Sequence, residues 1–123
     1  MGLDMYAFSV PQGTGSDFEL PEGVKREEVA YWRKFNALHG WMENLARDKG
    51  FDGEFNCVPV LLTPADLDQL ESDLKAKRLQ PVAGFFFGEQ TIYPEDVEAT
   101  QEFITRARQC QESGHDVYYD SWW

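Results

Sequence analysis

The longest segment with a helical period reads EEVAYWRKFNALHGWMENLARDK and covers residues 27–49. Apolar side chains recur along it at intervals of three or four residues, namely Tyr31, Phe35, Leu38, Met42 and Leu45. This spacing predicts one amphipathic helix whose apolar stripe packs against a core. Arg47 and Lys49 fall in its last turn, where cations suit the negative end of the helix dipole, and Gly50 follows as a stop signal.

Two further helices are predicted downstream. Thr63 and Pro64 have the residue types of an N-cap and a first helical position. Three leucines then recur on one face: Leu67, Leu70 and Leu74. The last helix is predicted over residues 94–112, with acidic residues in its first turn and Gly114 just beyond its end.

The remaining ordered segments are predicted to be strands. Residues 2–10 alternate with period two, and residues 117–123 have the aromatic content of a closing strand. A short strand is expected at about residues 57–62, where Pro59 favours an edge or a bulge. The segment GFFFG at residues 84–88 is either a buried strand or a loop whose rings fill the core.

Strands at both ends of the chain with helices between them predict the α+β class. We expect a single domain over residues 1–123, with about three helices packed on a small, mainly antiparallel sheet of one layer. The hydrophobic fraction of 42% and the aromatic fraction of 15% exclude intrinsic disorder.

The chain is strongly acidic, with 22 Asp and Glu against 11 Lys and Arg and a formal net charge of −11. This charge excludes sequence-independent binding to nucleic acid, because such binding needs a basic surface. It also opposes binding to anionic membranes. No apolar run reaches the roughly 18–20 residues of a membrane span, and the first residues lack the features of a signal peptide. We therefore expect a cytoplasmic location.

The sequence contains no motif for metal, cofactor or catalytic chemistry that we can assign. Cys57 and Cys110 are far apart, lack the spacing of metal ligands, and are expected to be reduced thiols. Neither a nucleophile elbow, a zinc-binding helix motif nor a phosphate-binding loop is present. We therefore predict no metal, no cofactor and no catalytic residue.

One edge of the predicted first helix carries groups that could bind a ligand. Trp32, Asn36, His39 and Glu43 recur at intervals of three or four residues and would share one shoulder beside the apolar stripe. His39 is the best-placed group for acid–base chemistry because an imidazole titrates near pH 6.5. Two interpretations stay open: a polar helix edge that satisfies neighbouring loops, or a site for a small molecule or partner.

A second candidate surface is acidic. Eight carboxylates lie on the two later helices: Asp66, Asp68, Glu71, Asp73, Glu95, Asp96, Glu98 and Glu102. Such a surface can simply keep an aromatic-rich protein soluble. Alternatively, it imitates the phosphates of nucleic acid and occupies a basic cleft on a partner.

Four segments in the same order resemble a family of short, uncharacterised bacteriophage, prophage and bacterial proteins. They are MGLDMY at residues 1–6, YWRKFNALHGW at 31–41, GFFFG at 84–88 and YYDSW at 118–122. The resemblance implies a bacterial or phage-infected cytoplasm and brings no activity with it. The family pattern maps onto Asp4, Tyr6, Trp32, Arg33, Asn36, His39, Trp41, Phe86, Tyr119 and Trp122.

The composition and the resemblance together predict a small acidic binding protein that acts on a host protein without catalysis. The alternative is a small-molecule binder or enzyme that uses the edge formed by Trp32, Arg33, Asn36 and His39. We expect a protein partner, no direct contact with nucleic acid or membrane, and a monomer or homodimer. The candidate binding residues are Asp4, Tyr6, Trp32, Arg33, Asn36, His39, Glu43, Trp41 and Tyr119.

Overall fold

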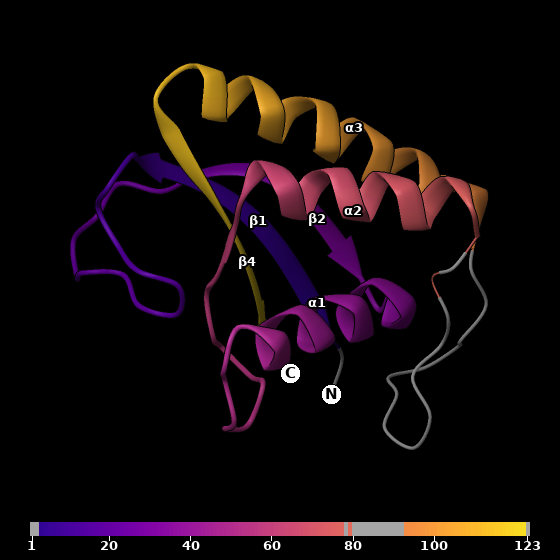
Figure 1. Cartoon of the computed structure of the whole chain (residues 1–123), viewed down its shortest axis with the longest axis horizontal. Helices are drawn as coiled ribbons and strands as arrows, with labels where there is room; N and C mark the ends of the chain where they lie inside the picture. Colours follow the sequence, from indigo (N-terminus) through magenta and orange to yellow (C-terminus); the bar gives the residue numbers. More distant parts are fainter. Residues whose placement is uncertain (1–2, 78, 80–92, 123) are drawn as a thin grey trace.

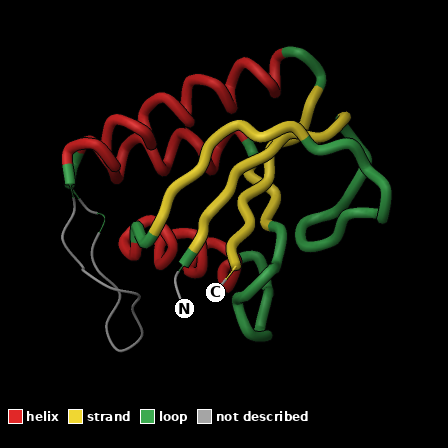
Figure 2. Tube along the Cα trace, turned by 180° about the vertical axis from the view of Figure 1, so that it is seen from behind, coloured by secondary structure: helices red, strands yellow, loops and turns green. Residues whose placement is uncertain are grey.

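The sheet of this protein has four antiparallel strands in the order β2-β1-β4-β3. They are β1 (Asp4–Pro11), β2 (Glu27–Arg33), β3 (Val60–Leu62) and β4 (His115–Trp122). The computed structural model describes residues 3–77, 79 and 93–122, so the segment at residues 84–88 lies outside the described residues. Figure 2 shows β2 along one edge of the sheet and β1 beside it.

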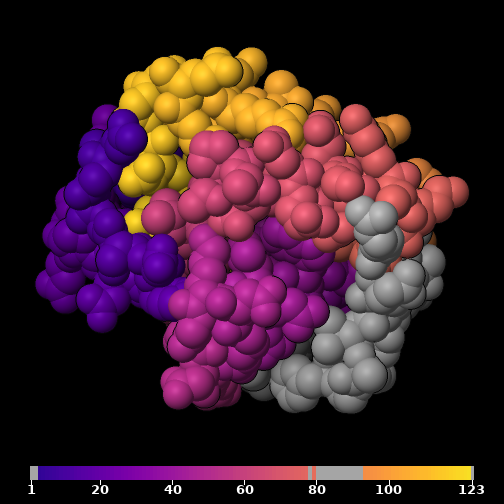
Figure 3. Space-filling model, viewed as in Figure 1, coloured from indigo at the N-terminus to yellow at the C-terminus, as the bar shows by residue number. Residues whose placement is uncertain are grey.

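Three helices cover one face of this sheet: α1 (Asn36–Asp48), α2 (Pro64–Lys75) and α3 (Pro94–Glu112). Figure 1 shows them on the same side of the strands, with both ends of the chain close together below α1. Figure 3 shows the helix side of the molecule, where α1, α2 and α3 close over the sheet. The α+β class and the single antiparallel sheet with a strand near each end are thus confirmed.

The predicted helix over residues 27–49 is wrong in its first third. Residues Glu27–Arg33 form β2, and α1 begins only at Asn36. Lys34 separates the two elements, because its φ of 57° lies in the left-handed region and cannot continue a helix. The aromatic and β-branched residues of EEVAYWR suit a strand, and Tyr31 points away from the core that it was expected to join. The rest of the apolar stripe is confirmed on α1.

The other helices follow their sequence signals closely. Thr63 caps α2 with a complete capping box: its hydroxyl accepts from Asp66 N, and the Asp66 carboxylate accepts from Thr63 N. Helix α3 has the predicted bounds, and Gly114 turns the chain into β4 with a φ of 85°. Two details differ from the predicted bounds: β3 is shorter than residues 57–62, and the last strand begins at His115 rather than at residue 117.

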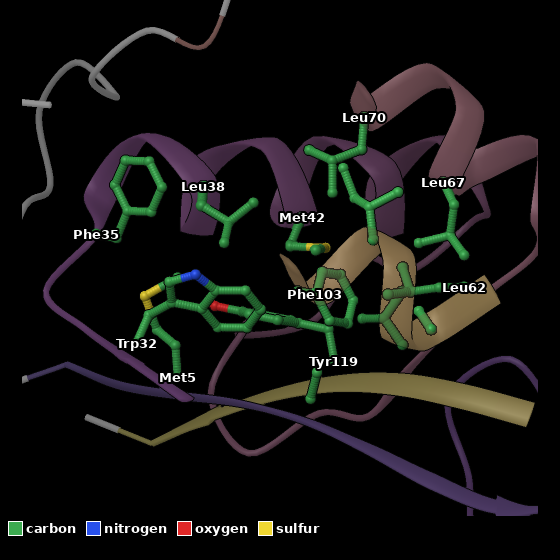
Figure 4. Packing of buried hydrophobic residues seen from close by; sticks show 14 of the residues in the cluster. Met5, Trp32, Phe35, Leu38, Met42, Leu62, Leu67, Leu70, Phe103 and Tyr119 are labelled. Carbon is green, nitrogen blue, oxygen red and sulfur yellow. The ribbon is translucent and has the colours of Figure 1, made fainter. Parts of the chain in front are cut away.

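The core lies between the inner face of the sheet and the helices. Figure 4 shows part of this core, with labels on Met5, Trp32, Phe35, Leu38, Met42, Leu62, Leu67, Leu70, Phe103 and Tyr119. Among the described residues, only one end of the outer face of the sheet is covered. There the loop between β1 and β2 places Leu20 and Val24 over Phe8, Val10 and Tyr118. The other end carries exposed aromatic side chains, Tyr31 and Trp122, and no described segment packs over it.

Candidate functional site

The residues of the predicted helix edge do not share one edge. Trp32 lies on β2 and points into the core, whereas Asn36, His39 and Glu43 lie on α1. The single shoulder is therefore wrong, because the chain leaves the helical path at Lys34. The structure instead places two of the predicted site residues in a buried polar pair, three on the open end of the sheet, and the others in separate contacts.

Trp32 has a structural environment. Its indole Nε1 donates a hydrogen bond to Thr100 Oγ1 at 3.1 Å, and the Thr100 hydroxyl donates in turn to Asp96 O at 2.8 Å. The indole also meets the ring of Phe103 edge-on, with 5.1 Å between centroids. Trp32 thus joins β2 to α3, with its N–H satisfied inside the core.

The buried polar pair consists of His39 and Tyr119. His39 Nδ1 and the Tyr119 hydroxyl lie 2.7 Å apart, and the Phe55 ring packs against both side chains. Burial lowers the pKa of His39 to about 4 and raises the pKa of Tyr119 well above its usual value. Both groups are therefore neutral near pH 7. Asn36 and Ser121 are also buried.

Lowering the pH is expected to destabilise the fold through His39. In the unfolded chain the imidazole titrates near 6.5, whereas burial holds the pKa of His39 at about 4 in the folded protein. Between these values the unfolded state binds more protons, so the free energy of unfolding falls as the pH drops. The expected loss approaches about 3 kcal/mol, and no further loss from His39 follows below pH 4.

Denaturant unfolding across this pH range measures the effect, with His39→Gln as the control. The variant should have a flatter pH profile than the wild type, because glutamine does not titrate while the carboxylates are shared by both proteins. Parallel profiles for the two proteins would contradict a buried neutral His39.

Two other predicted residues tie α1 to its surroundings. Trp41 Nε1 donates to Asp73 Oδ2 at 2.8 Å, which joins α1 to α2. Glu43 forms an ion pair with Arg47 at 2.9 Å on the same helix. Arg47 also donates to the backbone carbonyls of Phe51 and Gly53 and so holds the loop after α1. Their contacts are those of structural residues.

Three other predicted residues come together on the open end of the outer sheet face. Asp4 lies between Arg33 and Trp122 on neighbouring strands, and Tyr6 lies between Tyr31 and Asp120. These two rows of cross-strand neighbours form what we call the outer-face patch: Asp4, Tyr6, Tyr31, Arg33, Asp120 and Trp122. Because alternate residues of a strand point to opposite faces, all six side chains share one surface.

Contacts inside the patch order its rings. The Tyr31 hydroxyl donates to Asp4 Oδ1 at 2.7 Å, and the rings of Tyr6 and Tyr31 lie 5.3 Å apart. The hydrogen bond to Asp4 raises the pKa of Tyr31. Even so, 46% of Tyr31 and 63% of Trp122 are exposed to solvent. Large aromatic surface is therefore held in place without being covered.

Charges of both signs border these rings. Arg33 is exposed beside Asp4, and the Arg26 guanidinium lies over Phe8 at 4.6 Å from the ring centroid. Arg26 also approaches Asp120 at 4.0 Å. Burial raises the pKa of Asp120, and Arg26 partly offsets this shift. The patch has no excess of positive charge that would attract a phosphate backbone.

Three members of the patch were not among the predicted site residues. Tyr31 was assigned to the core, Asp120 was not considered, and Trp122 entered only through the family pattern. The signal that could have identified them is the period-two spacing of the patch residues in the segments 4–6, 31–33 and 118–122. If all three segments are strands, this spacing places those side chains on one face of the sheet.

Most of the predicted acidic face is paired within the chain. Ion pairs join Asp66 to Lys49 at 2.7 Å, Asp68 and Glu71 to Arg108 at 2.7 and 3.0 Å, and Glu102 to Arg106 at 4.0 Å. Arg108 thereby bridges α3 to α2. Asp73 accepts hydrogen bonds from Trp41 and Gln69.

Glu95, Asp96 and Glu98, in the first turns of α3, belong to the predicted acidic face and make no ion pair with another described residue. At this end of the helix they complement its dipole. Imitation of nucleic acid by this acidic face stays a prediction.

A shallow groove of about 320 Å³ lies between the start of β2 and the end of α3. Glu27, Arg106, Cys110 and His115 are among its lining residues, and Arg106 Nη1 donates to Val29 O at 3.4 Å. The groove thus carries charges of both signs. In the part of the chain that the structure describes, no group of His, Cys, Asp and Glu side chains is arranged to hold a metal ion.

No family model matches the chain, and no curated protein or solved structure shows a significant similarity to it.

Proposed function

We propose that this chain is a small protein-binding protein that contacts a partner through the outer-face patch. The observation that carries the proposal is the exposure of Trp122 and Tyr31 next to Arg33 on one open sheet face. Trp, Tyr and Arg are the residue types that dominate the binding energy of protein interfaces. Their position on paired strands adds to this support, because a rigid surface loses little entropy on binding.

The buried pair supports binding rather than catalysis. A general base must reach the proton that it removes, but His39 is 8% exposed and bonded to Tyr119. The mixed charges of the patch favour a protein partner over nucleic acid. None of the described helices has the length and apolarity needed to cross a bilayer. In this proposal the partner is a bacterial host protein met in the cytoplasm, and the chain is of phage, prophage or bacterial origin.

Photo-crosslinking tests the patch directly. A benzophenone amino acid placed at Trp122 should yield a discrete adduct with a partner protein in bacterial cells. The matched control is Tyr93, which is similarly exposed at 43% but precedes α3 on the helix side of the sheet. Equal adducts from both positions, or no adduct from position 122 in a folded, expressed protein, would contradict the proposal.

Truncation of the same aromatic residue should separate binding from folding. Trp122→Ala is expected to weaken capture of the crosslinked partner by at least about tenfold, as the loss of a central aromatic contact does. The free energy of unfolding should change by less than about 0.5 kcal/mol, since the side chain is largely exposed. Tyr93→Ala serves as the control for affinity, which it should leave unchanged.

A further inference from the structure

The outer edge of β2 is available for pairing with another strand. In the sheet order, β2 has β1 on one side and, among the described residues, no strand on the other. Figure 2 shows this edge position. An edge strand presents backbone N–H and C=O groups that a further strand can pair with.

The hydrogen-bond register identifies which groups face outward. Lys34 N donates to Leu3 O at 2.9 Å, so these opposed residues form a hydrogen-bonded pair. In an antiparallel ladder such pairs alternate with non-hydrogen-bonded pairs. The next pair along β2, Arg33 with Asp4, is therefore a non-hydrogen-bonded pair. Trp32 with Met5 is again a hydrogen-bonded pair, and Tyr31 with Tyr6 is again a non-hydrogen-bonded pair. The backbone groups of Tyr31 and Arg33 consequently point to the open edge.

We infer that β2 pairs with β2 of a second copy of this chain, antiparallel, about a two-fold axis at Trp32. In this register Tyr31 lies opposite Arg33 of the second copy, and Arg33 lies opposite its Tyr31. Both residues have outward backbone groups, so each pair exchanges two N–H···O=C bonds. The side chains meet on the outer face, where a guanidinium stacks favourably on a tyrosine ring.

The charge distribution suits this contact. Residues 25–34 hold four of the 11 basic residues of the chain, Lys25, Arg26, Arg33 and Lys34, against two acids, Glu27 and Glu28. The chain as a whole carries −11. The two facing segments are both basic, so salt screens their mutual repulsion, while the acidic remainder of each copy attracts the basic segment of the other.

A β-bulge limits how far the pairing can extend. The register of β2 against β1 shifts between Ala7 and Phe8, which places Val29 outside the regular ladder, and Arg106 donates to the Val29 carbonyl. The contact is therefore confined to the second half of β2. Such a short interface predicts weak, reversible dimers with a dissociation constant of about 10–100 μM.

Dimerisation would join the two sheets and bring both outer-face patches onto one continuous surface. Tyr31 and Arg33 belong to the patch through their side chains and to the edge through their backbone. The inference goes beyond the proposed function and does not depend on it, because self-pairing uses the backbone of β2 whether or not the patch binds a partner.

A matched pair of variants separates the edge from the patch. Tyr31→Pro removes the N–H that points to the open edge and leaves every hydrogen bond to β1 in place. Proline is accepted in an edge strand at such a position. Tyr31→Ala removes the same ring and keeps the N–H. In sedimentation experiments over a concentration series, Tyr31→Pro should dimerise at least about tenfold more weakly than Tyr31→Ala, because each copy loses one interchain hydrogen bond.

Amide hydrogen exchange gives a second measurement on the wild type. Exchange at Tyr31 and Arg33 should slow several-fold as the protein concentration rises, whereas exchange at Trp32, bonded to β1, should not depend on the dimer in this way. Arg33→Glu is the second variant and should also weaken the dimer, since it removes the guanidinium that stacks on the Tyr31 ring of the second copy. This variant leaves the backbone of β2 intact if Tyr31→Pro fails to fold.

A protein that stays monomeric up to about 1 mM would overturn the inference. A dimer that tolerates both Tyr31→Pro and Arg33→Glu would overturn it as well. Failure of the proposed function is distinguishable, because it is read from the adduct at Trp122 in cells. A missing adduct with an intact wild-type dimer rejects only the patch, and an adduct with a monomeric protein rejects only the edge pairing.

Discussion

Trp32→Ala is expected to lower the free energy of unfolding by about 3–5 kcal/mol, the range for truncation of a large buried ring. The indole is buried between β2 and α3, where it contacts Phe103 and donates its hydrogen bond to Thr100. Alanine leaves a cavity there and removes the donor from the Thr100 hydroxyl. Chemical denaturation followed by circular dichroism measures the loss.

Two other tryptophan variants calibrate this result. Trp32→Phe keeps most of the ring and loses the hydrogen bond, so its loss of stability should fall between those of the wild type and Trp32→Ala. Trp122→Ala should change stability little, although the same residue type is truncated. A loss below about 1 kcal/mol for Trp32→Ala would contradict the structural role and favour a ligand-binding role instead.

Leu38→Ala is expected to cost about 2–5 kcal/mol of stability. Leu38 is fully buried on α1, in the same cluster as Phe35 and Met42. The matched control is Asn44→Ala, an exposed position on the same helix where alanine has the better helix propensity and no cavity forms. If both variants unfold at the same denaturant concentration, the packing of α1 against the sheet is wrong.

Local sequence signals were sufficient to predict the helix ends where the chain has strong capping and helix-stop residues. The capping box at Thr63 and the bounds of α3 between Pro94 and Gly114 follow from short-range chemistry that does not depend on the rest of the fold. The predicted start of the first helix was wrong because Tyr31 lies four residues before Phe35 and so matches the helical period by coincidence. The break between them occurs at Lys34, a residue type that gives no warning of a left-handed conformation.

The candidate site was predictable only in part for a related reason. Asp4, Tyr6 and Arg33 were identified as single positions, but their common surface depends on β1 lying between β2 and β4. That order brings together residues separated by more than a hundred positions, such as Asp4 and Trp122. No local pattern encodes such an order. The buried contact between His39 and Tyr119 is a second example, since it joins α1 to β4.

The pairing of β1 with β4, from Asp4↔Trp122 to Pro11↔His115, also sets the order of events during folding. Bringing β1 and β4 together closes almost the whole chain into a loop, which costs more entropy than forming α1 or α2 does. The pairing of β1 with β4 is therefore among the slowest contacts to form. A ribosome releases the chain from its N-terminus at about 5–20 residues per second. Until β4 has emerged, β1 has only β2 as a partner and its other edge is open to aggregation. We therefore expect the nascent chain to be most prone to aggregation while α2 and α3 are synthesised, before β4 can pair with β1.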